Sequence, residues 1–173
     1  MTKDRLMMVI HDAMWYLVPA WAPNVHPMLV HFPIALFFTG VLIDVVAMPI
    51  PARARETLRH VATVLYCVGI LAALVTYFTG RAASQTVLVP GMAQALVKEH
   101  WNWALGTVWY FGGLTTVRLT LLFTSRPLRT RTMAALVVAG GFGLGLLYET
   151  ATRGAELVYE HGVGVGVLPG APP

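Results

Sequence analysis

The sequence VATVLYCVGILAALVTYFT, residues 61–79, is a long stretch without a charged residue. It has the length of a helix that crosses the hydrocarbon core of a bilayer, which takes about 20 residues. With the neighbouring apolar runs, it predicts membrane spans at about 27–48, 57–79, 100–123 and 133–150. The chain is 57% apolar and only 12% charged. Such a composition is typical of a protein whose main solvent is lipid.

The predicted fold class is all-α, an integral membrane four-helix bundle. Residues 1–22 predict an N-terminal interfacial amphipathic helix, since the tryptophans and tyrosine there suit the headgroup layer. Residues 23–167 should form the four-helix transmembrane domain, and residues 168–173 an irregular C-terminal tail. We expect the fourth span to end near Thr150 and the following residues to run along the surface. No internal repeat is strong enough to use.

Six of the twelve basic residues lie in two short loops, after the first and third spans: Arg53, Arg55, Arg59, Arg126, Arg129 and Arg131. Loops rich in arginine stay on the cytoplasmic side, so we expect a multi-pass protein with both termini extracytoplasmic. The net charge of +4 does not indicate nucleic acid, because these residues form no single basic surface.

Four of the six histidines fall near the extracytoplasmic ends of the expected helices: His26, His31, His100 and His161. An imidazole at membrane depth needs a bonding partner, which is another polar group, a metal or a haem iron. Two histidines on different helices can supply both axial ligands of one haem. We predict His31 and His100 as this metal-ligating pair, because they lie at similar depth. The other two could bind a second haem, contact a propionate or cap helix ends.

Several charged residues accompany the histidines. Arg81 and Arg153 could neutralise haem propionates or act as interfacial anchors. Asp44 and Arg118 are the charges farthest inside the expected spans, and we predict that they pair. Glu149 and Arg153 have the i, i+4 spacing of a helical ion pair.

These residues favour a membrane-bound b-type haem protein that carries electrons through a bis-histidine site, with one or two haems b. The single cysteine, Cys67, and the absence of a Cys-x-x-Cys-His sequence exclude covalent c-type haem for this chain. One alternative is a structural or accessory subunit of a larger respiratory or photosynthetic complex. Another is a protein that binds copper or zinc through the same histidines. No soluble-enzyme motif occurs, so an electron-transfer or accessory subunit is favoured over an autonomous enzyme.

Two motifs connect the chain to a family. The sequence HPMLVHFP, residues 26–33, resembles the opening of the DUF2231 family of predicted bacterial membrane proteins, and GAELVYEHGVGV, residues 154–165, resembles its closing motif. The resemblance covers about residues 23–167 and implies a bacterial inner (cytoplasmic) membrane. Similar domains occur beside Rieske-type and cytochrome c-type modules, which implies membrane redox chemistry. The expected partners are the lipid bilayer, subunits of a redox or photosynthetic complex, and quinone.

Overall fold

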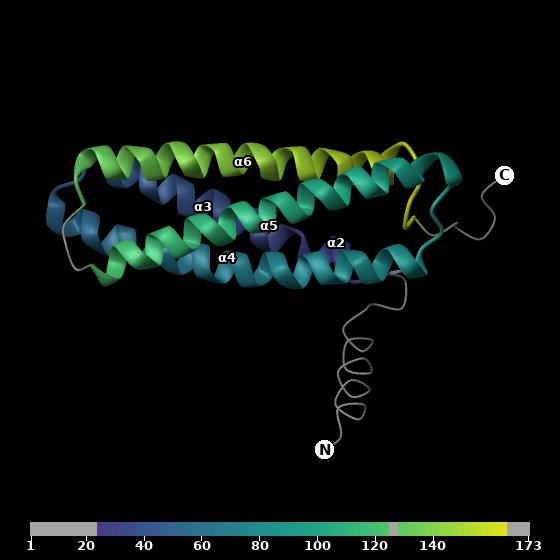
Figure 1. Cartoon of the computed structure of the whole chain (residues 1–173), viewed down its shortest axis with the longest axis horizontal. Helices are drawn as coiled ribbons and strands as arrows, with labels where there is room; N and C mark the ends of the chain where they lie inside the picture. The colour runs from purple at the N-terminus through teal and green to yellow at the C-terminus, as the bar shows by residue number, and fades with distance from the viewer. Residues whose placement is uncertain (1–23, 125–127, 166–173) are drawn as a thin grey trace, which may run out of the picture.

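A computed structural model describes residues 24–124 and 128–165. Its elements, in chain order, are α2 (His26–Leu29), α3 (His31–Ala47), α4 (Ala52–Thr86), the short 3-10 helix η1 (Gly91–Ala93), α5 (Gln94–Phe123) and α6 (Thr130–Tyr159). The long helices lie side by side along the longest axis of the molecule (Figure 1). No strand occurs in these two ranges, so the predicted all-α bundle is confirmed. The expected interfacial helix and the C-terminal tail lie outside them.

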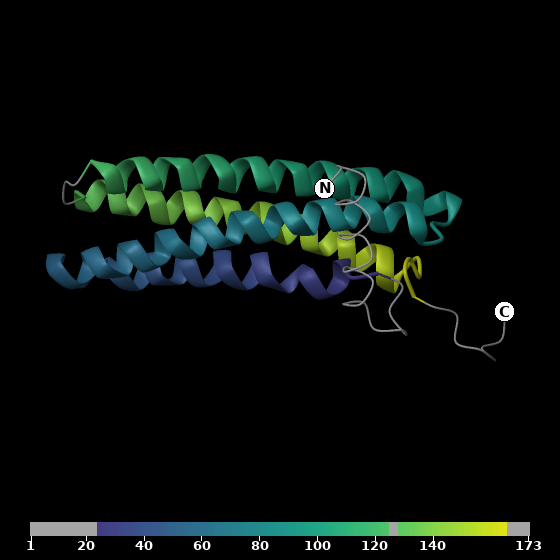
Figure 2. The same ribbon diagram turned by 90° about the horizontal axis from the view of Figure 1, so that it is seen from below.

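The helices form a closed ring of neighbours. α3 packs against α4 and α6, and α5 packs against the same two helices, which leaves α3 diagonally opposite α5. α2 precedes α3 with only Val30 between them, so the two act as one rod. One end, the arginine end, holds the last turns of α3 and α5 and the first turns of α4 and α6, with Arg53, Arg55, Arg59, Arg129 and Arg131. The starts of α2 and α5 and the ends of α4 and α6 lie at the other, the histidine end (Figures 1 and 2).

The surface of the bundle suits lipid. Three segments within the described ranges are long and apolar enough to cross a membrane: His26–Ala47, Arg53–Thr86 and Thr130–Tyr159. α5 is 30 residues long but is not among them, because Arg118 and several threonines interrupt its apolar run. It packs against two of these segments and therefore lies in the same layer. Large apolar side chains cover the outside, among them Phe38, Leu71, Phe78, Trp109 and Val138.

Two helices end later than the sequence predicts, and α5 begins at Gln94, six residues before its expected start. α4 continues through Gly80 to Thr86, and α6 continues through Gly154 to Tyr159. Neither glycine is a helix cap, because each lies in a helix interior against a histidine ring of the bundle. The expectation that the chain leaves the helix at Thr150 is therefore wrong. α6 ends instead at Tyr159, and three residues later the chain turns at Gly162, whose φ of 64° is easy only for glycine.

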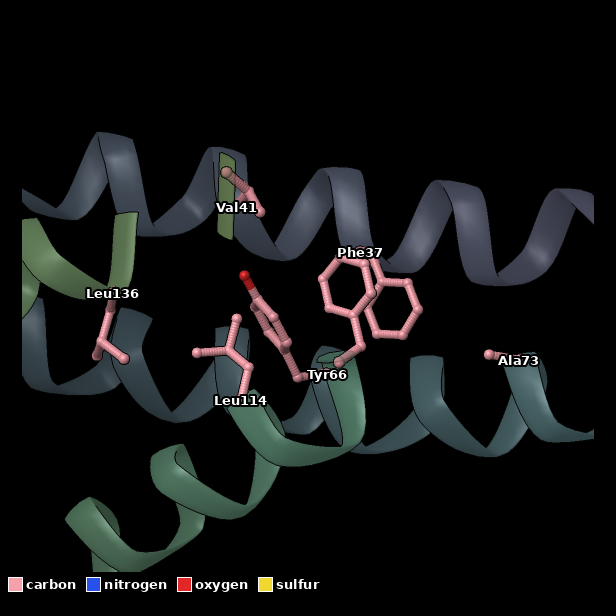
Figure 3. Packing of buried hydrophobic residues seen from close by; sticks show 7 residues of the cluster. Phe37, Val41, Tyr66, Ala73, Leu114 and Leu136 are labelled. Carbon is pink, nitrogen blue, oxygen red and sulfur yellow. The ribbon is translucent and has the colours of Figure 1, made fainter. Parts of the chain in front are cut away.

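The centre of the bundle is a pair of stacked phenyl rings. Phe37 of α3 and Phe111 of α5 lie with ring centroids 3.7 Å apart and planes 6° from parallel. Figure 3 shows this layer with its aliphatic neighbours. Two glycines make the close approach possible. A Cβ at Gly69 would lie 2.7 Å from a ring carbon of Phe37, and a Cβ at Gly143 would lie 2.7 Å from a ring carbon of Phe111.

An ion pair lies deeper, toward the arginine end. Arg118 of α5 donates two hydrogen bonds to the carboxylate of Asp44 of α3, at 2.6 and 3.0 Å. Both side chains are 1% exposed, and the guanidinium lies 4.4 Å from the ring centroid of Tyr66. A buried charge in an apolar layer needs such a partner, so the predicted pairing of Asp44 with Arg118 is confirmed.

The first prediction concerns the glycines of α6. Gly143→Ala should destabilise the bundle by about 1–3 kcal/mol, because the added methyl group overlaps the Phe111 ring. Gly141→Ala is the matched control, since a Cβ there meets nothing within 4 Å; it should stay within about 1 kcal/mol of the parent protein. Unfolding in detergent measures both. Equal stability of the two variants would contradict the packing described here.

Candidate functional site

Two histidines face each other across the histidine end of the bundle. His26 begins α2 and His100 lies in the second turn of α5, so the pair joins the two diagonal helices. Their ring centroids are 6.5 Å apart, and the ring planes meet at 79°. Both side chains are partly buried. The rings thus approach each other nearly at right angles inside the bundle.

Each ring is held by its Nδ1 atom. Nδ1 of His26 lies 3.0 Å from the backbone oxygen of Thr76 in α4, and Nδ1 of His100 lies 3.0 Å from that of Thr150 in α6. A carbonyl oxygen only accepts, so each Nδ1 carries the proton and donates, and each Nε2 keeps its lone pair. Within the described part of the chain neither Nε2 has a hydrogen-bond partner. Metal-ligating histidines are typically oriented in this way by a second group.

A glycine sits behind each ring. Gly80 follows Thr76 by one helical turn, and a Cβ there would lie 2.8 Å from Cε1 of His26. Gly154 follows Thr150 by the same interval, and a Cβ there would lie 3.1 Å from Cε1 of His100. A side chain at either position would displace the imidazole from its carbonyl. The glycines therefore allow each ring to lie directly on the neighbouring helix.

Both predicted propionate partners lie near these glycines in the sequence, and each already has a contact. The guanidinium of Arg81 lies 4.9 Å from the ring centroid of Trp101. Arg153 donates to the carboxylate of Glu149 at 2.5 Å, which confirms that predicted pair, and lies 3.7 Å from Glu99. The role of the two arginines toward a haem stays a prediction.

The other two predicted site histidines lie elsewhere. His31 is exposed on the outside of α3, and His161 lies in the turn that follows α6. The expected partner of His100 was His31, but the ring that faces His100 is that of His26. Five residues turn an α-helix by about 140°, so when His26 faces inward His31 faces outward. In the described ranges no group of three or more His, Cys, Asp or Glu side chains could hold a metal ion.

A signal in the sequence identifies the histidine that faces inward. The buried residues of α3 include Pro33, Phe37 and Asp44, spaced by four and seven positions. His26 precedes Pro33 by seven positions and continues this inward stripe, whereas His31 does not. Similar depth is thus insufficient for choosing a ligand pair, because the side chains must also share the inward face.

Lipid-facing apolar helices, a buried ion pair and a facing histidine pair define the chain as a helical membrane protein with a candidate ligand site at one end. The chain belongs to the family described as "Predicted membrane protein (DUF2231)", whose model matches residues 22–167. The resemblance seen in the two motifs is therefore confirmed. No curated protein matches the chain, and no solved structure does.

The second prediction concerns the state of the two rings. His26 and His100 should both carry their proton on Nδ1, because each Nδ1 donates to a carbonyl. Side-chain ¹⁵N NMR of histidine-labelled, reduced protein measures this, with exposed His31 as the control, which should show a mixture of tautomers. Gly154→Ala should move the His100 signals and leave those of His26 in place. An Nε2-protonated ring at either site would contradict the hydrogen bonds described here.

Proposed function

We propose that His26 and His100 are the two axial ligands of one haem b, and that the protein carries electrons through it. The separation of the rings supports the proposal most directly. Two imidazoles on opposite sides of one metal ion, each about 2 Å from it, have ring centroids about 6 Å apart. The observed separation is 6.5 Å. Both rings also have an unprotonated Nε2, which is the form that binds iron.

The surroundings of the pair also suit a flat cofactor. The two histidines come from α2, which continues into α3, and from the diagonally opposite helix α5. A flat haem ring between the two imidazoles would therefore have its edges toward α4 and α6. Those two helices carry Arg81 and Arg153 at this end. Guanidinium groups are suited to bind carboxylates such as haem propionates.

Electron transfer is the reaction class that two axial histidines favour. Iron with both axial positions filled by protein has no free position for oxygen or a substrate. The haem supplies the redox chemistry, and the chain supplies ligands, burial and nearby positive charge. The arginine-rich loops favour a cytoplasmic location for the arginine end. The histidine end would then face the extracytoplasmic side. There the haem would carry electrons between a quinol pool or membrane redox partner and an extracytoplasmic acceptor.

The third prediction tests the ligands. Protein purified from a bacterial membrane should show sharp α and Soret bands in a reduced-minus-oxidised spectrum. His26→Ala and His100→Ala should each abolish or strongly alter these bands, because each removes one axial ligand. His31→Ala is the matched control and should leave them unchanged. The oxidised protein should give the highly anisotropic low-spin EPR signal that nearly perpendicular imidazoles produce.

Four results would count against the proposal. Unchanged bands in both ligand variants would reject the pair, and loss of the bands in His31→Ala would return the ligand role to His31. Protein without these bands but with stoichiometric copper or zinc would replace haem by a metal ion at the same histidines. Protein with neither would favour a structural or accessory subunit of a larger complex.

A further inference from the structure

The contacts along the centre of the bundle share one sequence separation. Asp44 and Arg118 are 74 residues apart. The same separation relates the two facing histidines, residues 26 and 100, and the two stacked phenylalanines, residues 37 and 111. It also relates Tyr66 and Gly140, where a Cβ on the glycine would lie 2.7 Å from the tyrosine hydroxyl. Four pairs of positions with one offset therefore meet at the bundle axis.

Contacts within each half repeat with the same offset. The histidine of each half lies 50 residues before the threonine whose carbonyl it contacts. Each histidine also touches a glycine four residues beyond that threonine, and each phenylalanine touches a glycine, Gly69 in one half and Gly143 in the other. The contacts of one half align with those of the other half without an insertion or deletion. α3 with α4 and α5 with α6 are thus equivalent hairpins.

We infer that the bundle is a tandem duplication of one two-helix hairpin, residues 26–85 and 100–159, with a pseudo-two-fold axis along the bundle. Positions related by a two-fold axis touch each other only where they lie close to that axis. The four pairs with this offset do so from one end of the bundle toward the other. Parallel repeats related by an axis along the membrane normal are a known way to build membrane proteins.

Two of the four pairs explain why the halves are no longer identical. Like charges facing each other in the apolar core would be strongly destabilising, and the pair on the axis is one acid and one base, Asp44 and Arg118. Two tyrosines would overlap where Tyr66 meets Gly140. Each hairpin therefore presents a surface that fits the other hairpin and rejects a second copy of itself. Asp44 and Arg118 are the residues that determine this pairing.

The duplication also bears on the histidine site, and this step rests on the proposed function. Because each half contributes one histidine, one carbonyl and one glycine in the same arrangement, the bound group lies on the axis and has two equivalent faces. A haem iron or a single metal ion meets this condition.

The fourth prediction is an exchange of residues across the axis in the full chain. Asp44→Arg or Arg118→Asp alone should prevent recovery of monodisperse protein, because each buries two like charges. The double exchange Asp44→Arg/Arg118→Asp should restore it, since each position accepts the side chain of its equivalent. A double variant no more stable than the single variants would overturn the proposal.

A second exchange distinguishes a duplication from an ordinary ion pair. Arg118 stacks on the ring of Tyr66 in the parent protein. Position 140 is the equivalent of position 66 in the other half, so an arginine at position 44 needs an aromatic ring at position 140. Tyr66→Gly/Gly140→Tyr should therefore lower the thermal unfolding midpoint when made in the parent and raise it by a few degrees when added to the charge exchange. A shift of the unfolding midpoint in the same direction in the parent and in the charge-exchanged protein would overturn the duplication. The unfolding midpoint requires no bound haem, so this test stands whether or not the haem proposal fails.

Discussion

Lipid offers no hydrogen-bond partners, so the polar side chains of this chain must satisfy one another inside the bundle, and this constraint organises the structure. Its clearest result is the Asp44–Arg118 pair, which joins two diagonal helices in the apolar core. The hydroxyl groups of Thr107 and Thr150 meet in the same way at 3.0 Å. Most other threonine hydroxyls bond to the backbone of their own helix. The Asp44–Arg118 and Thr107–Thr150 contacts therefore join specific helices in a specific register.

That register determines the histidine site. From the ion pair toward the histidine end, the inward-facing residues of α3 include Phe37, and this face continues into α2 as far as His26. The inward stripe of α5 passes through Phe111 and reaches His100. Because both stripes have the same spacing, aligning the charges aligns the phenyl rings and then the imidazoles. A site at one end of the bundle thus depends on a contact several turns away.

Composition and the basic loops were sufficient to predict the helical membrane bundle, and depth was sufficient to predict the Asp44–Arg118 pair. The helix ends at Thr86 and Tyr159 could not be predicted, because a glycine that packs against a ring, as Gly80 and Gly154 do, looks the same in a sequence as one that ends a helix. The prediction paired His100 with His31, whereas the ring that faces His100 is that of His26, because depth was considered without the helical face. The duplication escaped notice because few residues are identical between the halves: His26, Phe37, Gly69, Thr76 and Gly80 recur 74 positions later, but most other residues do not.

The most direct test of the central claim is a high-resolution density map of the protein purified from a bacterial membrane. If the two imidazoles bind a haem iron or a metal ion on the axis, a metal peak should lie between the Nε2 atoms of His26 and His100, about 2 Å from each. A map in which the two rings touch directly, or in which another protein side chain separates them, would contradict the account.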